Sequence, residues 1–436
     1  LKLKSGSDVR GVASGTEEEI ELTDEVVRSI TNAFVVWLSE KIGKPDLKIA
    51  VGHDSRISAD RICGAVCDAL KTSGTDILLC GLCSTPAMFM MTRFDDTKAD
   101  GSIMITASHM PSKMNGLKFF VRSGGLSGDE IKEILALAKA GKKRKGNVSR
   151  SYKRDYMQLY CEHLIEFVRR SAGSDWPLTG FKIVVDAGNG AGGFYAERVL
   201  KPLGASTAGS QFLEPDGRFP NHIPNPEDKD AMKSISECVK TSGADLGIIF
   251  DTDVDRAAIV SSDGTEINRN LLIALAADIV LSEYPGSAVV TDSVTSDGLN
   301  KFITKRGGVH HRFKRGYRNV IDEAMRLNRE GRNAPLAIET SGHAAFKENF
   351  FLDDGAYLAT RIVIKMAQLK SRGLELKSLI SDLELPKEER EVRVKFTVQN
   401  WAEYGKMLID KLAEFCVDKE SVRLAPDNYE GIRANL

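Results

Sequence analysis

Three acidic residues alternate directly after an apolar run, and their spacing is the most specific chemical signal in the chain. Asp251, Asp253 and Asp255 follow the run 246–250. Carboxylates this close repel one another, and a hard divalent cation bound through oxygen, such as Mg²⁺ or Ca²⁺, stabilises their clustering. An EF-hand is excluded because the required glycine and terminal glutamate are missing downstream. The pattern predicts a metal site, and the competing interpretation is a solvated acidic turn.

A hydroxyl and two basic side chains follow another apolar run. Ser108 and His109 come after the run 103–105, and Lys118 lies a little further along. Ligands of open α/β sheets bind at the carboxyl ends of the strands, which is where this hydroxyl would be held. For an isolated Ser-His pair, a serine that merely caps a turn is the competing interpretation.

Two further loops carry groups suited to sugars and anions. The segment 339–343 (Glu-Thr-Ser-Gly-His) offers a carboxylate, a hydroxyl and a glycine turn, which suit sugar hydroxyls. The segment 314–318 (Lys-Arg-Gly-Tyr-Arg) places three cations around a glycine, as in an anion-binding loop. Taken alone, each is also compatible with a polar loop or surface charge.

The elements that must position these loops are short apolar strands that alternate with helical segments. Such alternation predicts mostly parallel sheets. The plan recurs in paired apolar runs at 48–51 with 101–105, 182–186 with 246–250, and 288–292 with 335–338. We therefore predict an α/β fold of three similar α/β domains, with mixed, mostly parallel sheets around a central cleft, plus an incomplete α+β C-terminal domain.

Changes in composition mark the expected boundaries between domains. A basic, glycine-bearing stretch covers 141–154, and charged residues give way to alternation at 392–396, where we expect a strand. The predicted domains are 1–155 (serine loop), 156–268 (metal site), 269–385 (sugar recognition) and 386–436 (incomplete α+β).

Composition excludes several classes of function. The 436 residues carry 60 Lys+Arg against 61 Asp+Glu, so no basic field favours nucleic acid. No apolar window is long enough to predict a membrane span. The seven scattered cysteines favour reduced thiols, and we interpret Cys80 and Cys83 as structural rather than metal-binding or redox residues. A cytoplasmic location is expected, or the plastid stroma if an N-terminal leader has been removed.

Together these loops resemble one family, the α-D-phosphohexomutases, which include phosphoglucomutases and phosphomannomutases. The segment 106–118 is similar to its phosphoserine loop, 251–256 to its magnesium loop, and 339–343 to its sugar-specificity loop. The segments 6–11 and 353–355 also match in order. The resemblance implies a phosphohexomutase that interconverts hexose 1-phosphate and hexose 6-phosphate of glucose, mannose or both.

The resemblance also implies a role for each candidate residue. Ser108 would carry the phosphoryl group, and the transfer would pass through a hexose 1,6-bisphosphate. Mg²⁺ would be held by Ser108, Asp251, Asp253 and Asp255. Acid–base and phosphoryl-contacting roles would fall to Lys118, His109, Arg10 and Arg256. Substrate would be bound by Glu339, Ser341, His343 and Lys314. The expected partners are small-molecule hexose phosphates, with a monomer or dimer as the assembly.

The sequence departs from the family pattern at three places. Met110 stands where the family usually has Asn. Thr252 and Val254 replace glycines of the metal loop, and β-branched residues resist positive φ. The Arg-Ser-Asn-Thr loop of the family's last domain is not found before residue 436, which suggests a truncated chain.

Two other functions remain open from the sequence. The first is a Mg²⁺-dependent aspartyl phosphatase with Asp251 as the nucleophile, because 251–253 also resembles the first motif of haloacid-dehalogenase-type phosphotransferases. The second is a non-catalytic homologue that binds sugar phosphate.

Overall fold

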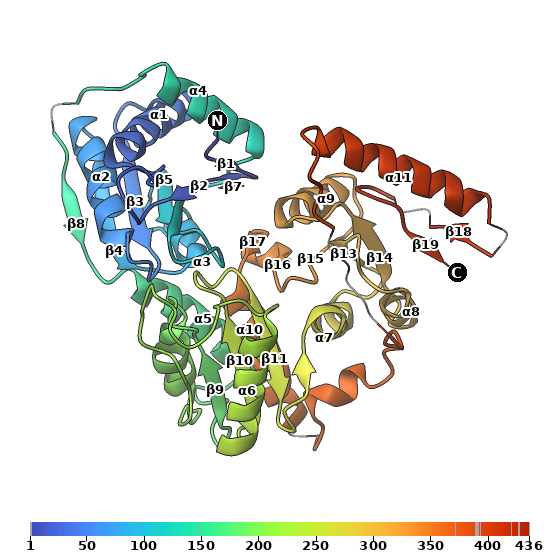
Figure 1. The fold of residues 1–436 in the computed structure, drawn as a ribbon. Helices are drawn as coiled ribbons and strands as arrows, with labels where there is room; N and C mark the ends of the chain where they lie inside the picture. Colours follow the sequence, from blue (N-terminus) through green and yellow to red (C-terminus); the bar gives the residue numbers. More distant parts are fainter. Residues whose placement is uncertain are drawn as a thin grey trace.

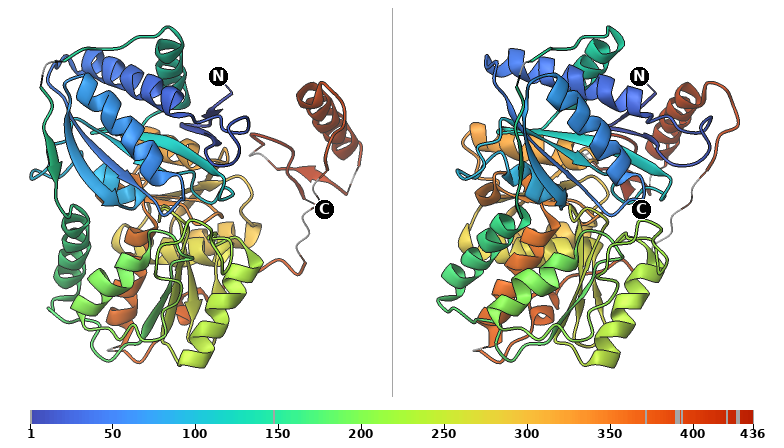
Figure 2. Two further views of the ribbon diagram at one scale, coloured as in Figure 1. Left: turned by 60° about the vertical axis from the view of Figure 1, so that its left-hand side comes forward. Right: turned by 90° about the vertical axis from the view of Figure 1, so that its left-hand side faces the viewer.

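The computed structural model describes residues 2–146, 148–370, 372–388, 392, 394–419, 421–425 and 428–435. Three α/β lobes and a C-terminal segment follow one another around an arc (Figure 1). Two further views show the C-terminal helix at the edge of the molecule (Figure 2).

The first lobe is built on an eight-stranded sheet, in the order β1-β2-β6-β5-β3-β4-β8, with β7 beside β6. Its central strands β5, β3 and β4 are parallel, whereas β6 and β2 run antiparallel to their neighbours. The elements are β1 (Lys4–Ser5), β2 (Asp8–Val12), α1 (Asp24–Ile42), β3 (Lys48–His53), α2 (Ala59–Thr72), β4 (Asp76–Leu82), α3 (Thr85–Met90), β5 (Gly101–Ile105), β6 (Met114–Val121), β7 (Gly124–Gly125), α4 (Gly128–Lys139) and β8 (Ser151–Lys153).

The second lobe has a four-stranded sheet in the order β12-β11-β10-β9. Helix α6 packs on β9, β10 and β11, because its apolar face meets their buried side chains. The elements are α5 (Met157–Ala172), β9 (Ile183–Asp186), a π-helical turn (Tyr195–Leu200), a 3₁₀ turn (Lys201–Leu203), α6 (Lys229–Ser242), β10 (Leu246–Phe250), β11 (Ala257–Ser261) and β12 (Glu266–Ile267).

The third lobe has a five-stranded sheet in the order β14-β13-β15-β16-β17. Its elements are α7 (Arg269–Glu283), β13 (Ala288–Asp292), α8 (Asp297–Lys305), β14 (Val309–Phe313), α9 (Tyr317–Arg329), β15 (Leu336–Ile338), β16 (Ala344–Phe346), a 3₁₀ turn (Lys347–Asn349), β17 (Leu352–Asp353), α10 (Gly355–Lys370) and a 3₁₀ turn (Leu376–Ile380). The C-terminal segment adds α11 (Trp401–Val417), β18 (Arg423–Leu424) and β19 (Ala434–Asn435).

The strand expected over 392–396 does not form at residues 392 and 394–396, and Arg393 lies outside the described residues. Across the described ranges, none of the helices is long and apolar enough to cross a bilayer.

Each predicted pair of apolar runs forms two adjacent parallel strands. The pairs are β3 with β5, β9 with β10, and β13 with β15. In every lobe the second strand of the pair is followed by an antiparallel neighbour, namely β6, β11 or β16. The α/β class with mixed sheets is therefore confirmed, and the three carboxyl-end loops leave the sheets at equivalent positions.

Helix α10 interlocks the third lobe with the second. It packs on α5, β11 and α7, and 12 of its 16 residues are buried. The Tyr195 hydroxyl of the second lobe hydrogen-bonds the Thr360 hydroxyl at 2.9 Å. One apolar cluster accordingly runs through all three lobes, while a second lies around α1, α2 and α4.

Candidate active site

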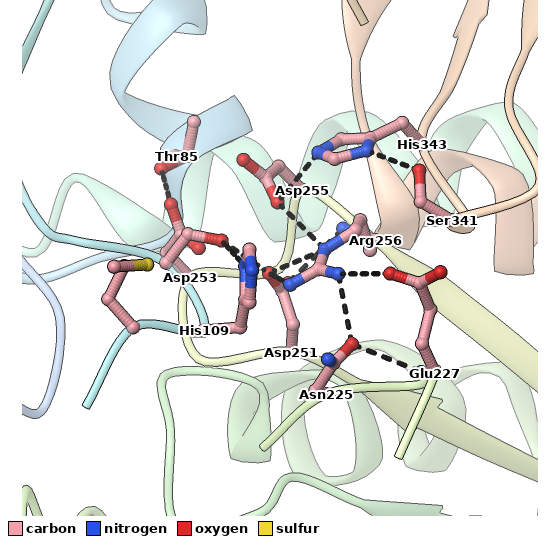
Figure 3. Close-up of polar contacts among 12 residues, drawn as sticks. Thr85, His109, Asn225, Glu227, Asp251, Asp253, Asp255, Arg256, Ser341 and His343 are labelled. Carbon is pink, nitrogen blue, oxygen red and sulfur yellow. Dashed lines mark hydrogen bonds and ion pairs between the residues drawn. The ribbon is translucent and has the colours of Figure 1, made fainter. Parts of the chain in front are cut away.

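The polar loops that follow β5 and β10 meet face to face (Figure 3). The Ser108 hydroxyl, from the first lobe, donates a hydrogen bond to Asp251 Oδ2 of the second lobe at 2.9 Å. Both residues are buried. The nucleophile candidate and the acidic cluster, which are separated by more than a hundred residues, therefore share one site.

A buried arginine holds the serine loop in its conformation. The Arg56 guanidinium donates to the carbonyl oxygens of Ser108 and Met110 at 2.5 Å, and to two more carbonyls of the loop at 2.8 Å. Its charge is balanced by Asp54, whose carboxylate lies 3.3 Å from Nε. Ser108 adopts a φ of 51°, a region that costs a non-glycine residue about 1–2 kcal/mol. These contacts offset that cost and direct the hydroxyl toward Asp251.

Asp251, Asp253 and Asp255 are all buried, and basic residues from two lobes surround them. Lys118 Nζ lies 2.5 Å from Asp255 Oδ2 and 3.5 Å from Asp253 Oδ2. The Arg256 guanidinium lies 3.1 Å from Asp251 Oδ2. The first lobe therefore supplies one of the counter-charges that make burial of this acidic loop possible.

Burial sets the protonation behaviour of the site. It raises the pKa of the Asp251 carboxyl well above its ordinary value. Burial acts on Asp255 in the same direction, but the charges of Lys118, His343 and Arg256 together outweigh it and hold the pKa of Asp255 low. Burial also lowers the pKa of His109 to about 4, so this imidazole is neutral near pH 7. Its Nδ1 lies 3.3 Å from Ser108 Oγ, where it can accept a proton.

Three residues that sequence reasoning missed support the acidic loop. Thr85, at the start of α3, donates its hydroxyl proton to Asp253 Oδ2 at 2.5 Å. Asn225 accepts a hydrogen bond from Arg256 at 2.9 Å, and Glu227 lies 3.6 Å from the same guanidinium. Each is an ordinary polar residue in a turn or helix start, so no local pattern distinguishes it.

The third lobe closes the site through the loop after β15. Its Glu339 accepts a hydrogen bond from the Gly316 amide at 2.5 Å, which joins the predicted sugar loop to the predicted anion loop. The Ser341 hydroxyl lies 2.9 Å from His343 Nδ1, and His343 Nε2 lies 3.6 Å from Asp255 Oδ1. Burial raises the pKa of Glu339 to about 7. This lobe therefore adds a carboxyl, a hydroxyl and an imidazole beside the acidic loop.

The acidic triplet has the donor chemistry of a divalent metal site. One carboxylate oxygen from each of Asp251, Asp253 and Asp255 lies within 4.8 Å of the others. Asp253 Oδ1 and Asp255 Oδ1 are buried without a hydrogen-bond partner among the described residues. Such oxygens are costly unless a cation or water engages them. The residues fit a hard cation such as Mg²⁺.

Arg10 and Lys314 differ from the other predicted site residues in their contacts and exposure. Arg10 pairs with Asp8 at 2.9 Å, and its Nε is buried without a hydrogen-bond partner in the described structure. Lys314 is exposed on the loop before α9. The neighbouring Tyr317, which sequence reasoning did not single out, stacks on the His343 ring with centroids 5.4 Å apart.

One of the two β-branched residues in the acidic loop, Val254, adopts a left-handed backbone conformation that is unfavourable for valine. Val254 has a φ of 66°, as expected for a position where a glycine is usual, whereas Thr252 is not among the positive-φ residues. Gly355 packs against this loop so closely that a Cβ there would lie 2.5 Å from the Arg256 carbonyl carbon. The start of α10 is thereby pressed onto the metal loop.

The site and fold define a class of protein, and sequence comparison identifies it. Three family models match: phosphoglucomutase/phosphomannomutase alpha/beta/alpha domain I over residues 2–145, domain II over 158–264 and domain III over 268–384. The chain belongs to the phosphoglucomutase/phosphomannomutase family, whose members are enzymes that move phosphate within hexose phosphates.

The similarity to known proteins extends over most of the chain. A phosphoglucomutase of Neisseria gonorrhoeae is 31% identical over 82% of this chain and 73% of its own length. A phosphomannomutase/phosphoglucomutase of Pseudomonas syringae pv. tomato is 30% identical over 89% and 78%. The crystal structure of a family protein from Burkholderia thailandensis superposes with a TM-score of 0.80 at 29% identity, covering 99% of this chain and 88% of that one. These relatives support a hexose phosphate mutase.

Proposed function

We propose that the chain interconverts the 1- and 6-phosphates of glucose or mannose, with Ser108 as the phosphoryl carrier. The observation that carries this proposal is the 2.9 Å hydrogen bond between Ser108 Oγ and Asp251 Oδ2, across the first and second lobes. This contact supports a nucleophilic role for the hydroxyl, which lies directly against the acidic loop. Asp251 is thereby engaged as a partner of the serine, which favours the mutase over an aspartyl phosphatase.

Mg²⁺ would be held by Asp251, Asp253, Asp255 and an oxygen of the phosphorylated Ser108. When bound, it would neutralise negative charge on the phosphoryl group during transfer. Arg10 Nε and one terminal nitrogen of Arg256 are buried without hydrogen-bond partners in the described part of the chain. The Arg10 Nε–H group is suited to a phosphoryl oxygen, and so is the second N–H of the Arg256 nitrogen, which lies 3.1 Å from Asp251 Oδ2.

In the transfer, the bond between phosphorus and Ser108 Oγ breaks while phosphorus bonds the free hydroxyl oxygen of the sugar. The hydroxyl proton passes to a base, and Ser108 Oγ regains a proton. His109, neutral and 3.3 Å from Ser108 Oγ, and Lys118, beside the acidic loop, are the residues placed for these proton transfers. The product is a hexose 1,6-bisphosphate, which reorients and returns its other phosphoryl group to Ser108.

Recognition of the sugar would fall to the third lobe. Glu339 and Ser341 supply an acceptor and a hydroxyl to O3 and O4, which glucose and mannose share. His343 and the loop carrying Lys314 complete this side of the site. A substrate hydroxyl would replace the backbone amide now bonded to Glu339.

Ser108→Ala tests the carrier role, with Ser112→Ala in the same loop as the matched control. In a coupled assay with Mg²⁺ and hexose 1,6-bisphosphate, we expect Ser108→Ala to lower turnover of both sugar phosphates by at least about 10³-fold. Ser112→Ala should retain turnover, and intact mass of the purified wild-type chain should show one phosphoryl group on Ser108. Phosphate release by Ser108→Ala at the wild-type rate would instead indicate an aspartyl phosphatase. Sugar-phosphate binding without turnover by the wild type would indicate a non-catalytic homologue.

A further inference from the structure

A second set of metal-type donors lies beside the acidic triplet, on the side of the third lobe. His343 Nε2 lies 3.6 Å from Asp255 Oδ1 and 3.5 Å from Asp353 Oδ2. One donor atom from each of the three residues lies within 4.8 Å of the others. Only Asp255 belongs to the triplet, and Lys118 occupies its other oxygen, Oδ2. Asp255 Oδ1, the oxygen that is also available to the triplet, therefore lies between the two sets of ligands.

The carboxylate of Asp353 is buried and accepts no hydrogen bond from the described residues. The residue is 7% exposed, and both of its carboxylate oxygens are buried without a hydrogen-bond partner among the residues described. Asp255 Oδ1 is likewise buried without a hydrogen-bond partner in the described part of the chain. A buried carboxylate left in this way is strongly unfavourable, so a ligand that engages these oxygens would be stabilised there.

The imidazole of His343 is oriented as a metal-binding histidine usually is. Its Nδ1 contacts the Ser341 hydroxyl at 2.9 Å and lies 3.7 Å from Glu339 Oε2. The ring also stacks on Tyr317 with an interplanar angle of 23°. Metal-binding histidines typically bond through one nitrogen and are held by a hydrogen bond at the other. Here the held nitrogen is Nδ1, and Nε2 faces Asp255 and Asp353.

The distances from His343 to the two carboxylates are compatible with a tetrahedral metal site. Bonds of about 2.0–2.2 Å in a tetrahedral site place neighbouring donors roughly 3.3–3.6 Å apart. An octahedral Mg²⁺ site, with bonds of about 2.0–2.1 Å, needs donors roughly 2.9 Å apart. The two distances from His343 Nε2, 3.5 and 3.6 Å, lie in the tetrahedral range. An imidazole nitrogen also favours Zn²⁺ or Co²⁺ over Mg²⁺.

We propose that Asp255, His343 and Asp353 form a second cation site, which shares Asp255 with the Mg²⁺ site and takes a four-coordinate transition metal such as Zn²⁺. Three protein ligands leave the fourth position open to water. Because Asp255 is shared, Zn²⁺ bound here would weaken Mg²⁺ binding at the triplet. The inference concerns metal binding by the chain alone, so it stands or fails independently of which sugar the enzyme uses.

X-ray absorption at the zinc edge of the wild-type chain, loaded with one equivalent of Zn²⁺ and no Mg²⁺, tests the ligand set. We expect one imidazole nitrogen and oxygen donors in a four-coordinate first shell. An all-oxygen shell would place the ion in the triplet and overturn the proposal. Failure to retain Zn²⁺ through gel filtration would overturn it as well.

Co²⁺ titration followed by visible absorbance assigns the residues. His343→Gln and Asp353→Asn should each weaken Co²⁺ binding by about 100-fold or more, because loss of a mere supporting partner already costs 10–100-fold. Asp253→Asn, which alters only the triplet, should keep the tetrahedral absorption band. His222→Gln is the matched control, since His222 also pairs with a buried carboxylate, Asp186, at 3.0 Å. Loss of the band in Asp253→Asn with retention in Asp353→Asn would contradict the assignment, and circular dichroism verifies that each variant is folded.

Discussion

Thr85 belongs to the first lobe, yet its hydroxyl orients a carboxylate of the second. Oγ1 donates to Asp253 Oδ2 at 2.5 Å, and the Thr85 amide donates to the Asp253 carbonyl at 2.8 Å. Both residues are buried. Thr85→Val keeps the shape of the side chain and the backbone bond, and removes only the donor to the carboxylate. The substitution therefore separates orientation of Asp253 from docking of the two lobes.

Two independent estimates give the expected rise in the Kd for Mg²⁺ in Thr85→Val. A hydrogen bond to a charged group contributes about 1.5–3 kcal/mol net. Loss of a partner that orients a metal ligand lowers metal affinity by about 10–100-fold, or roughly 1.4–2.8 kcal/mol. Because these ranges agree, we expect the Kd for Mg²⁺ to rise by about 10–100-fold in Thr85→Val.

Isothermal titration with Mg²⁺, and mutase activity measured against Mg²⁺ concentration, would both report this change. Thr31→Val is the matched control: Thr31 is fully buried in α1, and its hydroxyl bonds the Val27 carbonyl of the same helix, at 2.8 Å. It should leave the Kd for Mg²⁺ unchanged. A folded Thr85→Val protein whose Kd rises less than about twofold would refute the assignment of Asp253 as an oriented metal ligand.

Two further predictions concern stability. At Val254, where φ is 66°, Val254→Gly should be more stable than Val254→Ala by about 1 kcal/mol in urea unfolding, because both lose the buried side chain but only glycine relieves the left-handed backbone. Equal stability of the two variants would argue against strain there. Burial lowers the pKa of His310 to about 3 from an unfolded value near 6.5, so below pH 6.5 the unfolded state takes up a proton that the folded state does not. Between pH 6.5 and 5 the wild type should lose about 1.6 kcal/mol of unfolding free energy that His310→Gln retains, and parallel pH profiles would contradict this.

The strand pairs and the loops that follow them could be predicted because residues close together in the sequence specify them. Buried parallel strands are continuous apolar runs, and polar residues that follow them must lie at the carboxyl edge of the sheet. Ser108, Asp251 and Glu339 are therefore where the sequence indicates. Strand β6, which carries Lys118, was not predicted, since its buried side chains include Asn115 and Lys118 and show no alternation.

Long-range contacts account for what the sequence did not predict. Arg56 follows a strand as an ordinary polar residue, and only the fold shows that it binds four carbonyls of the serine loop. Helix α10 is apolar enough to be recognised as buried, but nothing in its pattern indicates that it packs on the second lobe. Thr85 and Asp353 acquire their importance from neighbours in another part of the chain.

The charged residues of the site come from three lobes and affect how stably the lobes pack together. An acidic loop buried alone would be unstable, because uncompensated buried carboxylates cost several kcal/mol each. The second lobe supplies Arg256, but Lys118 reaches the triplet only when the first lobe docks. Even then the buried acids outnumber the buried bases, since Asp353 and Glu339 of the third lobe add to the negative charge. Docking of the third lobe and binding of a divalent cation therefore favour each other, so removal of the cation should loosen the contact of that lobe with the acidic loop.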